Sequence, residues 1–227
     1  MAFTTINNPE LYFQVKLYTG TGSELAITLP GSENMQPDLI WNKERSGTEG
    51  QNWTDSVRGV TKYVMSNNND AESTNAQSVK SFDSDGFTLG TFDGMNTSSE
   101  TYVAWCWKAG TTSGITTNAA TDITPSAYSF NQTAGFSIIQ YTGNDTANQQ
   151  IAHGLGVAPH QIIVKSSSNS STNWAVYNIG VNGGSSPEDY ALELNTSDAQ
   201  EDEAGFWNDT VPDTVNFTVD RDGRTNN

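Results

Sequence analysis

The residues that could do chemistry in this chain are few. Its only histidines are His153 and His160, and neither has a cysteine or a second histidine at the spacing of a zinc site. The sequence holds no Gly-x-Ser-x-Gly nucleophile motif, no Gly-x-x-x-x-Gly-Lys phosphate loop and no Gly-x-Gly-x-x-Gly nucleotide motif. The 26 acidic residues could form a glycosidase-type pair in many combinations, so their presence does not indicate that reaction. We therefore assign no catalytic residue and expect a protein that is not an enzyme.

Two acidic turns offer the oxygen ligands that calcium prefers. Asp83-Ser84-Asp85-Gly86 and Asp220-Arg221-Asp222-Gly223 each resemble half of an EF-hand loop. Each lacks a third acid before the glycine and the distal glutamate that would complete the coordination shell. Because Asp-Gly is an ordinary turn pair, the sequence favours plain turns, and calcium at Asp83, Asp85, Asp220 and Asp222 is the alternative. We expect no other cofactor. The acidic residues of the stretch 198–203 are expected to form a solvated face.

Tryptophan could serve glycan recognition, because its ring stacks on the faces of sugars. The chain has six tryptophans, and most of them lie in apolar segments typical of a core. Trp207 stands between Phe206 and Asn208 in an acidic stretch and is therefore the glycan-binding candidate. Burial of this ring is the favoured interpretation, because large aromatic side chains are usually buried, and glycan binding is the alternative.

Charge and composition exclude several partners. The chain has 227 residues, with 10 basic against 26 acidic side chains and a formal net charge of −16. Such a surface repels phosphate backbones, so we expect no nucleic acid partner. No apolar run approaches the roughly 20 residues of a membrane span, and residues 1–5 do not resemble a secretion signal. The single cysteine, Cys106, allows no disulfide within the chain.

Short segments rich in β-branched and aromatic residues, bounded by turn residues, predict an all-β fold of antiparallel sandwiches. Helices are expected only as short turns, at 70–78 and from Ser197, where Asp198 could cap the first turn. The expected strands are 12–18, 39–41, 63–65, 87–89, 102–107, 135–141, 160–165, 174–177, 190–194 and 215–219.

Several of these segments recur in the same order, which indicates an internal repeat. Tyr18-Thr19-Gly20 recurs as Tyr141-Thr142-Gly143, and Pro37-x-x-Ile40-x-x-Lys43 recurs as Pro159-x-x-Ile162-x-x-Lys165. Further matched landmarks, separated by stretches of varying length, are Trp53 with Trp174, Asn67 with Asn195, Phe87 with Phe217, and Asn96 with Asn226. Loops that vary in length between conserved strands would give this pattern.

The repeat predicts the domain organisation. We expect an N-terminal arm at 1–11, a first sandwich at 12–108, a linker rich in Thr, Ala and Ser at 109–133, and a second sandwich at 134–227. In the first repeat the apolar strand 101–107 follows Asn96, but the second repeat contains no equivalent strand after Asn226. Either that strand is dispensable or lies in a longer protein, or a neighbouring subunit or the N-terminal arm supplies it.

The ordered motifs resemble a repeated module in virion proteins of tailed bacteriophages, especially marine ones. The resemblance covers nearly the whole chain and implies a concanavalin-like or jelly-roll-like β-sandwich on the particle surface, in head fibres, decoration proteins or tail fibres. It brings no catalytic residue with it. The segments that carry it are 16–20, 36–41, 55–62, 81–90, 101–108, 135–138, 141–143 and 153–159.

These observations predict a non-enzymatic structural protein of a phage virion. We expect it to be made in the host cytoplasm and to lie on the surface of the head or tail. Its expected partners are other virion proteins and further copies of itself, in a homo-oligomer. The alternative is a lectin-like tail-fibre module that binds a glycan of the host surface through Trp207.

Overall fold

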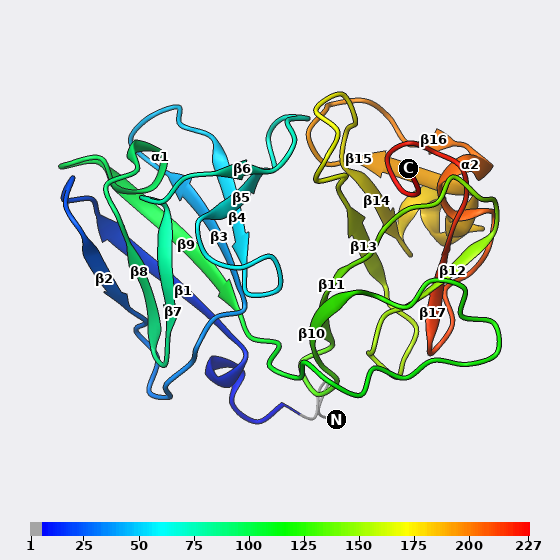
Figure 1. The fold of residues 1–227 in the computed structure, drawn as a ribbon, viewed down its shortest axis with the longest axis horizontal. Helices are drawn as coiled ribbons and strands as arrows, with labels where there is room; N and C mark the ends of the chain where they lie inside the picture. Colours follow the sequence, from blue (N-terminus) through cyan, green and yellow to red (C-terminus); the bar gives the residue numbers. More distant parts are fainter. Residues whose placement is uncertain (1–5) are drawn as a thin grey trace. The chain divides into compact units, whose positions relative to one another are not determined.

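A computed structural model of the protein describes residues 6–227. The chain is all-β, with several antiparallel sheets, and is consistent with a β-sandwich architecture (Figure 1). It divides into two compact units. Unit 1 comprises the chain up to Met65 together with Glu72–Thr111, and unit 2 comprises Ser66–Ala71 together with Thr112–Asn227. None of the helices in the described chain has the length and apolar character that a membrane span requires.

The elements of unit 1 are short and joined by turns. Its two helical turns are η1 (Pro9–Leu11) and α1 (Asp93–Asn96). Its strands are β1 (Phe13–Thr19), β2 (Leu25–Thr28), β3 (Leu39–Glu44), β4 (Gln51–Asp55), β5 (Lys62–Met65), β6 (Ser73–Thr74), β7 (Val79–Asp83), β8 (Gly86–Leu89) and β9 (Thr101–Trp107).

Strand β9 organises unit 1, because it pairs antiparallel with both β1 and β3 in a six-stranded sheet of order β1-β9-β3-β4-β5-β6. A second sheet has the order β2-β8-β7. The side chains that alternate inward from both sheets form one core, as the period of two along a strand requires. That core includes Ile27, Ile40, Phe87, Ala104 and Cys106, each at most 4% exposed.

Unit 2 is built from similarly short elements. Its helical turns are η2 (Val181–Gly184), η3 (Pro187–Asp189) and α2 (Ala204–Trp207). Its strands are β10 (Ala127–Asn131), β11 (Phe136–Gln140), β12 (Gln149–Ala152), β13 (Gln161–Val164), β14 (Ala175–Asn178), β15 (Tyr190–Glu193), β16 (Glu201–Asp202) and β17 (Asn216–Val219).

The sheets of unit 2 are smaller. Strand β10 pairs with β11, β12 pairs with β17, and four strands form the order β13-β14-β15-β16. All of these pairs are antiparallel. The core gathers Ile151, Ala175, Tyr177, Phe206 and Phe217, with Ile139, Tyr141 and Ile162 packed against it as partly buried side chains.

The all-β prediction is confirmed, and every predicted strand corresponds to an observed one with slightly different ends. The helix predictions are wrong. The region 70–78 contains turns and strand β6, and the second helical turn is α2, which begins at Ala204 rather than at Ser197. Asp70, where the predicted helix would begin, lies in a local turn, since the Asp70 N–H donates to Asn68 Oδ1. Glu203, and not Asp198, caps α2 by accepting from the Gly205 N–H.

The segment 109–133, expected as an extended linker, carries structure of its own. It contains β10, and Ile123 forms a parallel bridge with Ile151 of β12. The Ile115 N–H donates to the Tyr128 hydroxyl at 3.2 Å. Of the expected N-terminal arm, residues 1–5 lie outside the described chain. In its described part, the carboxylate of Glu10 accepts two hydrogen bonds from Ser32, at its N–H and its hydroxyl.

Candidate functional site

The repeated asparagine of unit 1, Asn96, is fully buried at the end of α1 and ties three pieces of backbone together. Its Oδ1 accepts from the Thr21 N–H at 2.8 Å. Its Nδ2 donates to the carbonyls of Ser23 at 2.6 Å and Gly90 at 2.7 Å. The Asn96 carbonyl accepts from the Gly22 N–H. The side chain therefore fixes the loop between β1 and β2 against α1.

Asn226 occupies the matching place in unit 2 and is 1% exposed. Its Oδ1 accepts from the Asn144 N–H at 3.0 Å, and its Nδ2 donates to the Thr146 carbonyl at 2.7 Å. The Asn226 carbonyl accepts from the Asp145 N–H. Asn226 thus holds the loop that precedes β12 in the way that Asn96 holds the loop that precedes β2.

Other repeated side chains also hold backbone. The Tyr18 hydroxyl donates to the carbonyl of Met95 in α1, and the Tyr141 hydroxyl donates to the carbonyl of Thr225. Burial raises the pKa of both phenols above their ordinary value. Lys43 Nζ donates to two carbonyls of the loop that follows its strand, and Lys165 Nζ does the same. Because the polar atoms of these side chains form hydrogen bonds to the backbone of their own unit, the matched residues stabilise the fold of each unit.

The outer face of the six-stranded sheet is aromatic. Trp41 of β3 lies 5.0 Å from the Trp53 ring and 5.5 Å from the Trp105 ring, centroid to centroid. Phe13 of β1 lies 4.9 Å from Trp107 of β9. The strand register places Val15 beside Trp105. Side chains from four neighbouring strands therefore make one continuous apolar layer on this face.

This apolar layer reaches solvent at strand β1, the edge of the sheet. Phe13, Val15 and Leu17 alternate along β1 on its outer face and are 37%, 37% and 57% exposed. We call these three residues the β1 apolar row. Exposed apolar side chains on an unpaired edge strand are typical of a surface that contacts another protein. The sequence does not reveal this row, because alternation alone does not tell which face of a strand is covered.

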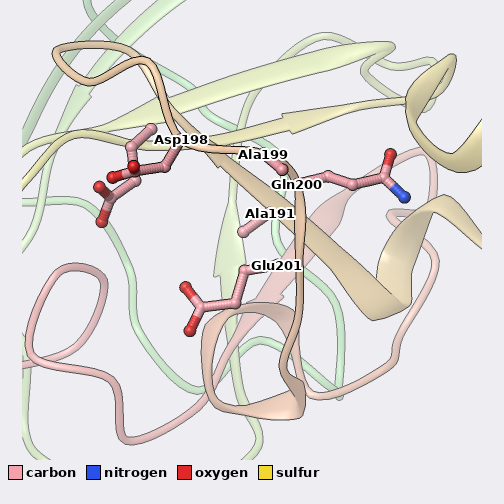
Figure 2. Close-up of a pocket in the computed structure, with 6 residues that line it drawn as sticks. Ala191, Asp198, Ala199, Gln200 and Glu201 are labelled. Carbon is pink, nitrogen blue, oxygen red and sulfur yellow. The ribbon is translucent and has the colours of Figure 1, made fainter.

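One hollow of unit 2 is acidic. It has a volume of about 430 Å³ and lies against β15 and β16, where it is lined by Ala191, Glu193, Asp198, Ala199, Gln200 and Glu201. Figure 2 shows that the side chains of Asp198 and Glu201 point to one side while that of Gln200 points to the other. Asp198 and residues 201–203 are exposed, which confirms the expected solvated face.

Arg224 neutralises part of this acidic region. Its guanidinium bonds Glu193 at 2.6 Å and Asp222 at 2.8 Å, lies 3.5 Å from Glu201 and sits 3.9 Å from the centroid of the Phe206 ring. The hydrogen bond with Asp222 is the main cause that raises the pKa of Arg224. The cation is held by its partners and is therefore part of the unit 2 scaffold. Sequence analysis did not single out Arg224.

The four calcium candidates do not meet. Asp83 Oδ2 accepts from the Thr88 hydroxyl across the β7–β8 hairpin, and Asp85 Oδ1 accepts from the Met35 N–H of the loop between β2 and β3. Asp222 is paired with Arg224, and Asp220 Oδ1 is buried. Within residues 6–227, no group of three or more His, Cys, Asp or Glu side chains is arranged to hold a metal ion. Asp83, Asp85 and Asp222 are thus engaged in hydrogen bonds or an ion pair, and Asp220 Oδ1 has no hydrogen-bond partner within the described chain.

The glycan-binding expectation for Trp207 is contradicted by its position. The side chain is 2% exposed and belongs to the core of unit 2, at 6.1 Å from Tyr177 and 6.2 Å from Phe206 between ring centroids. It is the fourth residue of α2, and helix periodicity turns it inward together with Phe206. A sugar could not stack on a ring that solvent does not reach. The interpretation that the sequence favoured, a packed aromatic, is therefore correct.

The two histidines differ. His160 is exposed, whereas His153 is 4% exposed and fixed at both ring nitrogens. His153 Nδ1 accepts from the Leu155 N–H at 3.1 Å, and Nε2 lies 3.1 Å from the Asp213 carbonyl, to which it donates. These partners select the neutral ring, and burial lowers the pKa of His153 below its ordinary value. His153 therefore holds a turn in place.

The comparisons with known proteins identify the family of the chain. Residues 8–227 match a domain family of unknown function, DUF7483, and the chain belongs to that family. The comparison with curated proteins found no match. The comparison with solved structures found none either.

Proposed function

We propose that the chain consists of two tandem copies of one concanavalin-like β-sandwich module and serves as a non-enzymatic structural protein on the surface of a tailed-phage virion. In this role it is a decoration or fibre component that assembles through protein–protein contacts. The observation that carries the proposal is the equivalence of Asn96 and Asn226, which make the same kinds of hydrogen bond in two units.

The strand registers support the duplicated module. Ile27 of β2 faces Phe87 of β8, and Ile151 of β12 faces Phe217 of β17 in the same register. The repeated sequence signal therefore encodes backbone geometry and core packing. A duplicated scaffold of this kind is suited to building larger assemblies, where extended contact surfaces matter more than a cavity.

The β1 apolar row supports assembly into a homo-oligomer. Its three exposed side chains lie on the edge strand of the six-stranded sheet, where a second copy could pair β1 with β1 and bury both rows. The net charge of −16 keeps such assemblies soluble and is screened by salt. The lectin alternative relied on Trp207 as its glycan-binding residue, and Trp207 is buried.

Localisation tests this function directly. Mass spectrometry of particles purified by density gradient should find the chain in a fixed ratio to the major head protein, and immunogold labelling of intact particles should place it on their outer surface. Absence from the particles, with specific binding of the purified chain to host glycans, would instead support the lectin.

A further inference from the structure

Three polar side chains are fully buried between the sheets of unit 1. Asn42 of β3 and Asn52 of β4 are each 1% exposed, and Thr54 of β4 is 0% exposed. The Asn42 Oδ1, Asn52 Oδ1 and Thr54 Oγ1 atoms have no hydrogen-bond partner within residues 6–227. We call these three atoms the buried oxygen cluster. Buried polar atoms of folded proteins are nearly always hydrogen-bonded, so three unpaired oxygens in one region need an explanation.

The strand register places the three side chains together on the inner face of the six-stranded sheet. Asn42 faces Asn52 across the β3–β4 ladder, and the core residue Ile40 faces Thr54. Because side chains alternate along a strand, all three polar side chains point to the face that Ile40 occupies. Ala104 of β9, which faces Asn42 on its other side, contributes only a methyl group there. Directly opposite and diagonal positions of a ladder have Cβ atoms about 5 and 7 Å apart, so one small molecule can bridge these side chains.

Neighbouring hydrogen bonds fix the orientation of the Asn42 amide. The Tyr18 hydroxyl donates its only proton to the Met95 carbonyl at 2.7 Å. The Asn42 atom that lies 2.6 Å from this hydroxyl must therefore be the donor, Nδ2. The opposite orientation would place Oδ1 against an oxygen that has no proton left to donate. Asn42 Oδ1 is thus an acceptor that still requires a donor.

The Asn52 amide is fixed in a similar way. Its Nδ2 donates to the Gly50 carbonyl at 3.3 Å and to the carbonyl of Gly94 in α1 at 3.2 Å. The opposite orientation would place Oδ1 against two carbonyl oxygens, so Asn52 Oδ1 is also an acceptor that requires a donor. The Thr54 hydroxyl can both donate and accept. The buried oxygen cluster therefore offers two acceptors and one hydroxyl, and none of its side chains carries a charge.

Unit 2 has apolar side chains at the corresponding positions. Two residues after the repeated isoleucine of its strand, unit 2 has Val164 where unit 1 has Asn42. Val164 faces Ala175 across the β13–β14 ladder, as Asn42 faces Asn52 across the β3–β4 ladder. Val164 and Ala175 are both buried in the core of unit 2. The same strand pair can therefore form with apolar residues, so strand packing alone does not explain the two amides of unit 1.

We propose that the buried oxygen cluster binds one internal water molecule, which donates to Asn42 Oδ1 and Asn52 Oδ1 and accepts from the Thr54 hydroxyl. Water matches this set because it has two protons to donate and lone pairs that accept, and buried waters typically make about three hydrogen bonds. A cation fits less well, because the cluster has no carboxylate to offset the loss of its hydration shell. The water links β3 to β4 beneath α1, and it is part of unit 1 whether or not the chain is a virion protein.

A high-resolution crystal structure of the full chain tests the proposal without any substitution. We expect one peak of electron density at about 2.7–3.0 Å from each of the three oxygens, as hydrogen bonds require. A peak at about 2.3–2.5 Å with additional ligands would indicate a cation and would overturn the proposal. The lack of any peak between the three side chains would overturn it as well.

NMR tests the same site in solution. An internal water transfers magnetisation to the Thr54 methyl group, and the rotating-frame experiment separates this transfer from proton exchange by its sign. The double variant Asn42→Val/Asn52→Ala copies the facing pair of β13 and β14 and removes both acceptors. We expect the variant to lose this transfer by about tenfold or more, because the water keeps a single partner. The control Asn227→Ala, at an exposed asparagine, should leave the transfer unchanged.

Two single variants guard against a double variant that does not fold. Thr54→Val keeps the shape of the side chain but removes its hydroxyl, whereas Thr54→Ser keeps the hydroxyl. The transfer from water to the Asn42 side-chain amide should be weakened in Thr54→Val and remain close to that of the wild type in Thr54→Ser. Equal transfer in these two variants, or wild-type transfer in a folded double variant, would overturn the proposal.

Discussion

Asn96 and Asn226 have the same role in their two units. Each is buried, accepts a hydrogen bond at Oδ1 from the loop between the first two strands of the repeat, and donates from Nδ2 to a carbonyl of that loop. Each also accepts a bond from the same loop at its own carbonyl. In each unit, one buried asparagine therefore holds the loop between two strands in place. This shared role explains why the two asparagines match in the sequence.

Replacement of either asparagine should therefore be costly. Asn96→Ala leaves one N–H and two carbonyls without their partner, and we expect a loss of about 3 kcal/mol in the free energy of unfolding. Asn226→Ala should cost a comparable amount. Denaturant unfolding measures both, with Asn227→Ala, at an exposed neighbouring position, as the control that should stay within about 0.5 kcal/mol of the wild type. A small loss of unfolding free energy for both variants would contradict the stabilising role of the two asparagines.

The sequence could predict the strands because their local signals agree with the final packing. The segments around Tyr18, Phe87 and Phe217 alternate apolar and polar residues, and the segment around Ile162 is a run of β-branched residues. All of them lie between turn residues and form strands. Strand β2 (Leu25–Thr28) and strand β12 (Gln149–Ala152) were missed, because each holds a single isoleucine and no aromatic residue, a weaker strand signal than that of the equally short β8 and β13. Strand β10 was missed because its segment has the composition of a linker and gains order by pairing with β11.

The candidate sites could be predicted much less well than the fold. Trp207 stands in an acidic stretch, but a single turn of helix at α2 turns the ring into the core, and local composition does not reveal that turn. The ion pairs of Arg224 join residues as distant in sequence as Glu193 and Asp222.

The buried position of Trp207 gives a prediction that separates packing from recognition. Trp207→Ala should cost about 3–5 kcal/mol of stability by leaving a large cavity in unit 2. Trp207→Phe should cost much less, because it keeps most of the ring volume and removes an indole N–H that has no partner within the described chain. Thermal unfolding measures both losses. Near-equal, small losses for the two variants would contradict the core assignment.

His153 makes the stability of the protein depend on pH. Its pKa is lowered in the folded state, so below the ordinary range near 6.5 the unfolded chain binds a proton that the folded chain does not. Stability should therefore fall as the pH decreases from about 7 through the lowered pKa, and be restored as the pH rises. Urea unfolding of wild type and His153→Gln between about pH 5 and 7.5 measures this, because the variant should lose the part of the slope due to His153. Equal slopes would exclude His153 as the cause.

The buried thiol of Cys106 should be unreactive in the folded protein. The side chain is 0% exposed in the core of unit 1, and burial raises the pKa of the thiol to about 12. At pH 8 a thiol-specific reagent should therefore modify the native chain much more slowly than the chain unfolded in guanidinium chloride. Rapid labelling of native protein would show that strand β9 opens readily, against its place between β1 and β3.

The β1 apolar row should control self-association. Leu17→Lys and Val15→Lys place charges on the exposed face of the edge strand and should weaken a homo-oligomer about tenfold or more without unfolding unit 1. Sedimentation velocity over a range of concentrations measures the change. The control is Val211→Lys, at another exposed apolar position that is 60% accessible, and it should leave the association unchanged. Equal effects of all three would indicate a general charge effect.

The account rests on the strand orders of the two units, in which β13 is an edge strand among the described residues and β3 is paired on both sides. Hydrogen exchange of the free chain, read residue by residue by NMR, tests this most directly. Along β13, the Ile162 amide, directed toward β14, should exchange slowly while the Ile163 amide exchanges at least about tenfold faster. Along β3, Ile40 and Trp41 should both be protected, because β4 and β9 cover its two edges. Equal protection of Ile162 and Ile163 would contradict the account.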